Sequence, residues 1–174
     1  MTPSNLDEAF QLLRTIGAPP RLLRHGELVC EAAELLIAGL QKLRVPIHAD
    51  FIRVGAALHD AGKTVRPEEL ERPGNAHEPA GEALLLHHGA TADIARICRS
   101  HAQWRELDVT LDELLVALSD KLWKGVRNGA LEELVVERVA AVTKKERWEA
   151  FTAIDALFEN VAADADERLE RSVT

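Results

Sequence analysis

The stretch Phe51-Ile-Arg-Val-Gly-Ala-Ala-Leu-His-Asp60 joins an apolar run to a histidine and an aspartate at its end. The run predicts a buried helix from about Asp50 to Asp60. A neighbouring imidazole nitrogen and carboxylate oxygen at the end of a buried helix offer a divalent ion two ligands of different hardness. The stretch therefore predicts a helix that ends at a metal site.

Apolar residues recur at spacings of three and four on both sides of this stretch, as they do in amphipathic helices. A first helix is expected to begin at Ser4 and to stop at Gly17. In the second helix, His25 shares one stripe with Leu22, Val29 and Leu36, so its side chain is expected to face inward. Further helices are expected over residues 77–88, 92–103, 111–124, 131–142 and 145–169.

The helix expected over 111–124 has a capping box, with Thr110 as the cap and Glu113 as its reciprocal partner. The core stripe expected for the helix over 145–169 consists of Trp148, Phe151, Ile154, Leu157, Phe158 and Val161. The segment 62–76, which holds Pro67, Pro73 and Gly74, is expected to be a loop with one turn and a candidate lid beside the His-Asp pair.

No stretch shows the alternation of apolar and polar residues that is typical of strands. We therefore predict an all-α protein with a single domain over residues 1–174. Its motif-bearing core is expected within 20–126, with helices over 130–170 packed on it. At 174 residues with 47% hydrophobic content, the chain is large enough to bury one core without disulfides or a structural metal.

The composition of the chain also indicates its cellular location and the kinds of partner that it could bind. Cys30 and Cys98 lack metal-ligand spacing and are expected to be buried thiols. The N-terminal residues resemble no secretion signal, and no run reaches the roughly 18 apolar residues of a membrane span. A cytoplasmic protein without membrane contact is therefore expected. The formal charge of -8 argues against binding to a nucleic acid polymer, but it allows a small phosphorylated ligand in a locally positive cleft.

Motifs with histidine or aspartate flank the His-Asp pair in a fixed order. They are Arg24-His25, His77-Glu78-Pro79-Ala80-Gly81, Ser100-His101 and Ala117-Leu118-Ser119-Asp120-Lys121. An aspartate beside the apolar stripe of its helix, as at Asp120, is costly unless a cation compensates its charge. In this order the motifs resemble the HD superfamily of metal-dependent phosphohydrolases. The layout is also similar to the subgroup that hydrolyses dinucleoside tetraphosphates.

The resemblance implies an HD-type helical bundle and a set of metal ligands. His25, His59, Asp60 and Asp120 match the minimal pattern for one ion, and His77 and His101 stand where a second ion would be held. Asp60 would then bridge the two ions. Ligands rich in imidazole and carboxylate suit Fe, Mn, Co, Ni or Zn better than Ca or Mg.

The expected chemistry is attack on phosphorus by a metal-activated water, with Asp60 and Lys63 in the catalytic machinery. The residues expected to contact an anionic substrate are Lys63, Lys121, Lys124 and Arg127. These basic residues have an alternative interpretation, because lysines on helix faces are usually just solvated. His77, the candidate metal ligand, could likewise point into solvent at the start of its helix. The substrate is expected to be a nucleotide or dinucleotide, and a nucleoside monophosphate or an alarmone remains open. A catalytically silent nucleotide-binding module is the alternative from another class, and the oligomeric state stays open.

Overall fold

The computed structural model describes residues 2–173, and no strand occurs within this range. The prediction of an all-α, single-domain helical bundle is confirmed. The elements in chain order are α1 (Leu6–Thr15), α2 (Pro20–Lys42), α3 (Ala49–Leu58), the 3₁₀ helices η1 (Ala61–Thr64) and η2 (Pro67–Leu70), α4 (His77–His87), α5 (Ala92–Ser100), α6 (Leu111–Leu122), α7 (Gly129–Thr143), α8 (Arg147–Ala163) and α9 (Ala165–Ser172).

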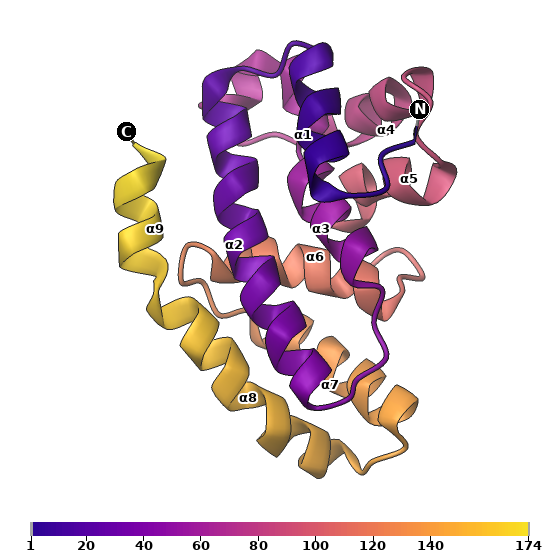
Figure 1. Cartoon of the computed structure of the whole chain (residues 1–174), viewed down its shortest axis with the longest axis vertical. Helices are drawn as coiled ribbons and strands as arrows, with labels where there is room; N and C mark the ends of the chain where they lie inside the picture. The colour runs from indigo at the N-terminus through magenta and orange to yellow at the C-terminus, as the bar shows by residue number, and fades with distance from the viewer. Residues whose placement is uncertain (1, 174) are drawn as a thin grey trace.

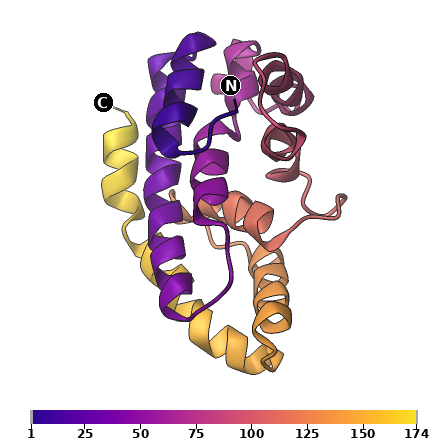
Figure 2. The same cartoon turned by 45° about the vertical axis from the view of Figure 1, so that its right-hand side comes forward.

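Helix α2 runs along the long dimension of the molecule and organises the bundle (Figure 1). It packs on α3 and α6 on one side and on α8 and α9 on the other. Figure 2 shows the same arrangement from a second direction, with α9 still beside α2. The core contains fully buried aliphatic side chains of α2, α3 and α6, among them Leu28, Leu36, Ile52, Leu58 and Leu115. These helices therefore form a rigid frame for the polar residues at their ends.

The helix caps partly follow the prediction. Thr110 and Glu113 form the expected capping box at the start of α6. At α1 the expected start at Ser4 was wrong, because the side chain of Asn5 accepts the hydrogen bond from the backbone N–H of Glu8. Asparagine in the extended conformation is an equally good cap, so the two adjacent candidates could be separated only by the fold.

The single helix expected over 145–169 was wrong. The chain breaks at Asp164 into α8 and α9, and the expected core residues Trp148 and Phe151 are 68% and 50% exposed. The stripe that α8 buries is instead made of Ala150, Ile154, Phe158 and Val161. The break lets Ala165 pack against Gly125, so a contact distant in sequence overrides the local periodicity.

Both cysteines are buried, as expected, and burial raises the pKa of each thiol above its ordinary value. Within residues 2–173, no helix combines the length and the apolar character that crossing a bilayer requires.

Candidate metal centre

The structure brings the six predicted residues into one cluster at the centre of the bundle. His25 projects from α2, and the His-Asp pair follows directly after α3. His77 is the first residue of α4, His101 is the C-cap of α5, and Asp120 lies in the last turn of α6. Five different helices therefore supply the cluster, and all six residues except His25 are buried.

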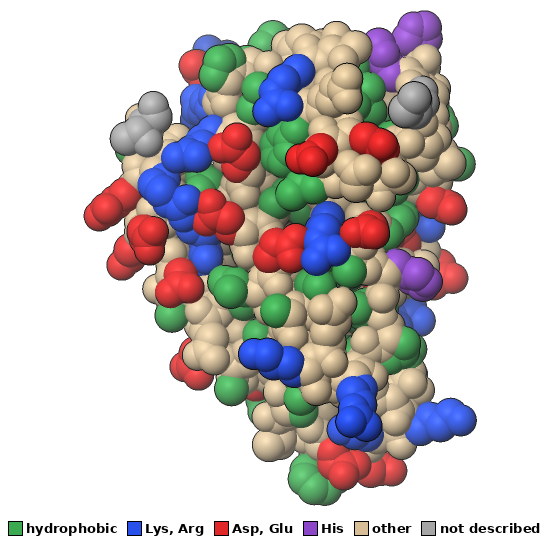
Figure 3. Space-filling view, in the orientation of Figure 1, with side chains coloured by type: hydrophobic (Ala, Val, Ile, Leu, Met, Phe, Trp, Pro, Cys, Tyr) green, Lys and Arg blue, Asp and Glu red, His purple; other side chains and the backbone are tan. Residues whose placement is uncertain are grey.

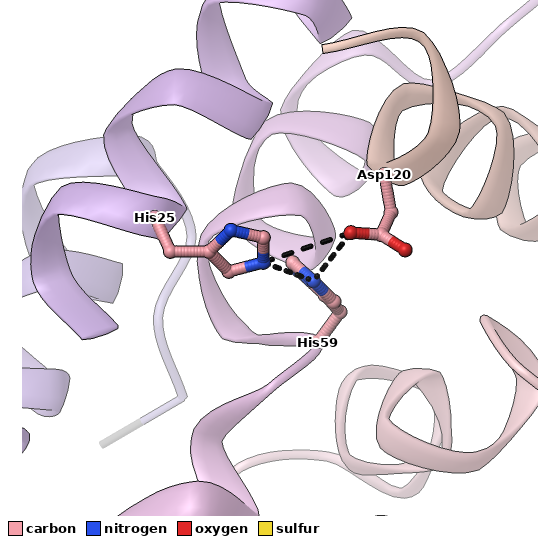
Figure 4. A group of neighbouring side chains, drawn as sticks. All are labelled: His25, His59 and Asp120. Atoms are coloured by element: carbon pink, nitrogen blue, oxygen red, sulfur yellow. Dashed lines mark hydrogen bonds and ion pairs between the residues drawn. The ribbon is translucent and has the colours of Figure 1, made fainter. Parts of the chain in front are cut away.

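Figure 4 shows His25, His59 and Asp120 with their polar atoms pointing toward one another. The Nε2 atoms of His25 and His59 are 3.1 Å apart. Asp120 Oδ1 lies 3.6 Å from the first of these nitrogens and 3.5 Å from the second. His25, His59 and Asp120 form one group that could hold a metal ion, and His59, Asp60 and His101 form another.

Asp60 lies between two pairs of histidines. Its Oδ2 is 3.3 Å from His25 Nε2 and 3.6 Å from His59 Nε2. Its Oδ1 faces the other pair, at 3.2 Å from His77 Nε2 and 3.7 Å from His101 Nε2. Each carboxylate oxygen therefore addresses a different pair of imidazoles, which is the arrangement expected of a carboxylate shared by two cations.

Backbone carbonyls orient two of the rings. His59 Nδ1 lies 2.8 Å from the carbonyl oxygen of Ala56, and His101 Nδ1 lies 3.1 Å from that of Ile97. A neutral ring that donates from Nδ1 presents an unprotonated Nε2 on its other side. The carbonyls thus favour the tautomer in which Nε2 offers a lone pair to the cluster, as outer partners of metal-binding histidines do.

The third oriented ring belongs to His77, and its partner Glu69 was not predicted. Glu69 Oε2 lies 2.5 Å from His77 Nδ1 and also accepts the backbone N–H of His77 at 3.1 Å. On the inner side, His77 Nε2 is buried and makes no hydrogen bond of good geometry. A buried nitrogen without such a partner is costly, and a cation beside Asp60 would satisfy it.

Charges within the cluster determine the protonation state of the two aspartates, Asp60 and Asp120. Burial raises the pKa of both Asp60 and Asp120, but the neighbouring imidazoles outweigh it and hold both pKa values well below the ordinary range. The Lys63 ammonium lies 2.6 Å from Asp60 Oδ2, and the Lys121 ammonium lies 2.9 Å from Asp120 Oδ2. Both carboxylates are therefore ionised acceptors at neutral pH.

Comparison with known proteins agrees with this geometry. The profile of the HD domain family matches residues 13–123, which is more than half of the chain. The chain belongs to the HD domain family. HD domains are metal-dependent phosphohydrolases and bind divalent cations, and the cluster offers groups of histidine and aspartate side chains that could hold such an ion.

Among curated proteins, the chain is similar to ribonuclease Y of Thermotoga petrophila and of Thermotoga maritima. Each is 33% identical to this chain over 111 residues, which are 64% of this chain and 21% of the relative. The chain thus spans only about a fifth of the length of these relatives. No solved structure matches it significantly.

A cleft of about 920 Å³ opens beside the centre of this HD domain. His25, Asp60 and Lys63 line it, so the cleft leads from solvent to the edge of the histidine and aspartate cluster. The other lining residues are Pro20, Arg21, Arg24, Leu70, Trp123, Ser172 and Val173. Sequence reasoning had singled out neither Arg21 nor Trp123, although the Trp123 ring packs against His25 at a centroid distance of 5.2 Å.

The structure does not bring Lys124 and Arg127 to this cleft. The Arg127 guanidinium instead pairs with Glu132 and Asp155, at 2.7 Å from each. Lys121 contacts Asp120 without lining the cleft. Of the four residues expected to contact substrate, only Lys63 therefore faces the opening.

Proposed function

We propose that this protein is a metal-dependent phosphohydrolase that acts on a nucleotide or a dinucleoside polyphosphate. The observation that supports it best is Asp60, whose two oxygens face two pairs of histidines at the base of an accessible cleft. The layout of the motifs makes a dinucleoside tetraphosphate the favoured substrate. We further propose a cytoplasmic location.

The side chains fit a pair of divalent transition metal ions. His25, His59, Asp60 and Asp120 would hold one ion, and Asp60, His77 and His101 would hold the other. The mixture of imidazole and carboxylate suits Fe, Mn, Co, Ni or Zn better than Mg, which prefers oxygen ligands. Bound at these residues, such ions would generate a nucleophile from water at neutral pH and neutralise charge on the phosphoryl oxygens.

The chain's own cations complete the binding of an anionic substrate. Lys63 has three N–H donors, so it can keep its contact with Asp60 and still donate to a phosphoryl oxygen in the cleft. Arg21 and Arg24 place two guanidinium groups along the same opening. Guanidinium groups bind phosphate in a bidentate manner. Because Arg24 already donates to Glu27 and to the backbone carbonyl of Arg171, Arg21 is the side chain better suited to bind a phosphate that is not attacked.

The dimensions of the cleft favour a small substrate. Its volume of about 920 Å³ is at the upper end of the roughly 300–1,000 Å³ typical of small-molecule sites. The charge of -8 opposes the approach of a long polyanion. Both observations favour a nucleotide over a polymer.

Two other functions remain as alternatives. Ribonuclease activity is favoured by the 33% identity to ribonuclease Y, and it would require an RNA strand to reach the same cleft. A catalytically silent module that only binds a nucleotide is the other. The presence of all six candidate ligands in one cluster favours an enzyme, because a module that only binds does not need them.

A substrate panel tests the proposal. The metal-loaded protein is expected to release phosphate or a nucleoside phosphate from mononucleotides, dinucleotides or dinucleoside tetraphosphates with Mn, Co, Fe or Ni, and chelation should abolish this activity. RNA and Mg-supported reactions serve as comparisons. Absence of turnover with every metal would shift the assignment to the silent module, and turnover of RNA alone would shift it to a ribonuclease.

Metal binding is expected to weaken as the pH falls through the pKa values of two ligand histidines, beginning above the ordinary histidine value of about 6.5. Burial lowers the pKa of His59 and His77, but the carboxylates around them outweigh it, so both pKa values lie above the ordinary value in the metal-free protein. Raised pKa values keep these rings protonated in weak acid, and protons then compete with the metal. Burial and the charge of His59 lower the pKa of His101 to about 4, so this ring stays neutral.

Calorimetric titration with Mn²⁺ or Zn²⁺ measures this linkage. In buffers of different ionisation enthalpy, binding should release protons, and the release should increase in weak acid. An affinity that stays constant across this pH range would remove His59 and His77 from the ligand set.

A further inference from the structure

Helix α9 lies outside the region that matches the HD domain family, yet its end reaches the cleft. The family profile ends at residue 123, whereas Ser172 and Val173 are part of the cleft lining together with Asp60 and Lys63. Figure 1 shows α9 running alongside α2, toward the end of the molecule that holds α1 and α4. This helix is therefore an element outside the matched region that borders the cleft.

A buried arginine holds α9 on the helix that carries Asp120. Arg168 is only 2% exposed. Its Nε donates to the carbonyl oxygen of Trp123 at 2.9 Å, and its Nη2 donates to those of Leu122 and Val161. The first two carbonyls belong to the C-terminal end of α6, where carbonyls lack partners within the helix and a cation is favourable. Arg168 thus fixes α9 relative to the end of α6.

A second set of contacts ties the end of α9 to α2. The Arg171 guanidinium forms a bidentate pair with Glu31, at 2.7 and 2.6 Å. The backbone carbonyl of Arg171 accepts a hydrogen bond from Arg24 Nε at 3.0 Å. Because Arg24 also lines the cleft, the segment that follows Arg171 is positioned directly against the substrate opening.

The outer side of α9 is acidic. Asp166, Glu167 and Glu170 are exposed, and Figure 3 shows acidic side chains along the edge of the molecule where α9 lies. A polyanion that extended beyond the cleft over this helix would meet charges of its own sign. A substrate that ends inside the cleft would not.

We propose that the end of α9 is a wall that sets substrate size, admitting a mononucleotide or a dinucleoside polyphosphate and excluding longer oligonucleotides. Ser172 and Val173 form the wall, and Arg168 is the positioning residue that holds it. The proposal rests on the phosphohydrolase function for its kinetic test. The wall itself can also be tested by binding.

The test compares the small nucleotide identified by the panel with an oligonucleotide that carries the same reacting group. The selectivity is the ratio of the two kcat/KM values. Arg168→Met is expected to lower it about tenfold, and Val173→Ala by a smaller factor, because small changes in a pocket wall alter discrimination on this scale. Val173→Trp, which narrows the opening, should raise it. Arg147→Met and Val142→Ala, at exposed positions outside the cleft, are the matched controls.

Fluorescence anisotropy with a labelled oligonucleotide supplies a readout that needs no turnover. The wild-type protein should bind it weakly, and Arg168→Met and Val173→Ala should bind it more tightly at unchanged metal content. Because Val173 is 86% exposed, its variants should fold even where Arg168→Met does not. A selectivity and an oligonucleotide affinity that stay constant in both Val173 variants would overturn the wall. If the wild type turns over neither substrate, the hydrolase function fails, and the anisotropy result still decides the wall.

Discussion

Asp60→Ala is expected to remove bound metal and to lower kcat/KM by about four orders of magnitude, because metal activation supplies several kcal/mol of transition-state stabilisation. Asp60 is the one side chain in the cluster whose oxygens lie within 3.7 Å of four histidine Nε2 atoms. Its loss therefore weakens both candidate metal positions together. Elemental analysis of protein purified without chelators, followed by steady-state kinetics, measures both effects.

His77→Ala gives the contrasting result. The group formed by His25, His59 and Asp120 stays intact in this variant, so one of two ions should remain. His87→Ala, at an exposed position on the same helix, is the control and should keep the full metal content. Unchanged metal content in Asp60→Ala would refute the assignment of the His-Asp pair. One ion per chain in both the wild type and His77→Ala would make the centre mononuclear.

The sequence predicted the helices best where the pattern is local. The apolar periodicity of α2 also predicts its buried face, and it orients His25 inward because a ligand on a core stripe shares the direction of its apolar neighbours. Helix α6 is instead buried on nearly all sides, because it lies at the centre of the bundle. The break at Asp164 had no such signal. Residues 145–169 continue a helical pattern, and the chain turns there because Ala165 and Arg168 find partners near the end of α6.

The candidate site likewise contains residues that the sequence predicted and residues that it did not. The six clustered residues were found through the order of their motifs, which resembles a known family. Glu69 lies in a short 3₁₀ turn without periodicity, and its contact with His77 exists only once the segment between η1 and α4 is folded. Arg127 had the correct charge for a phosphate contact, but a basic side chain does not reveal in sequence that Glu132 and Asp155 will bind it.

Gly62→Ala is expected to destabilise the protein by more than about 3 kcal/mol, as forced overlap in a packed interior does. A Cβ at Gly62 would lie 1.8 Å from the carbonyl oxygen of His77 and 2.6 Å from the backbone nitrogen of Gly81. Both are backbone atoms of α4, so no side chain can rotate away, and the helix itself must shift. The shift would carry His77 away from Asp60.

Gly129→Ala is the matched control for this substitution. A Cβ there meets no atom within 4 Å, and Gly129 is the first residue of α7, so alanine should leave the stability unchanged or slightly higher. Thermal and urea unfolding should therefore show a large loss of stability only for Gly62→Ala. Where Gly62→Ala still folds, its metal content should fall as in His77→Ala, because the same nitrogen is displaced. Equal stability of both variants would mean that η1 and α4 do not pack at this close distance, and the position of His77 beside Asp60 would then lose its structural basis.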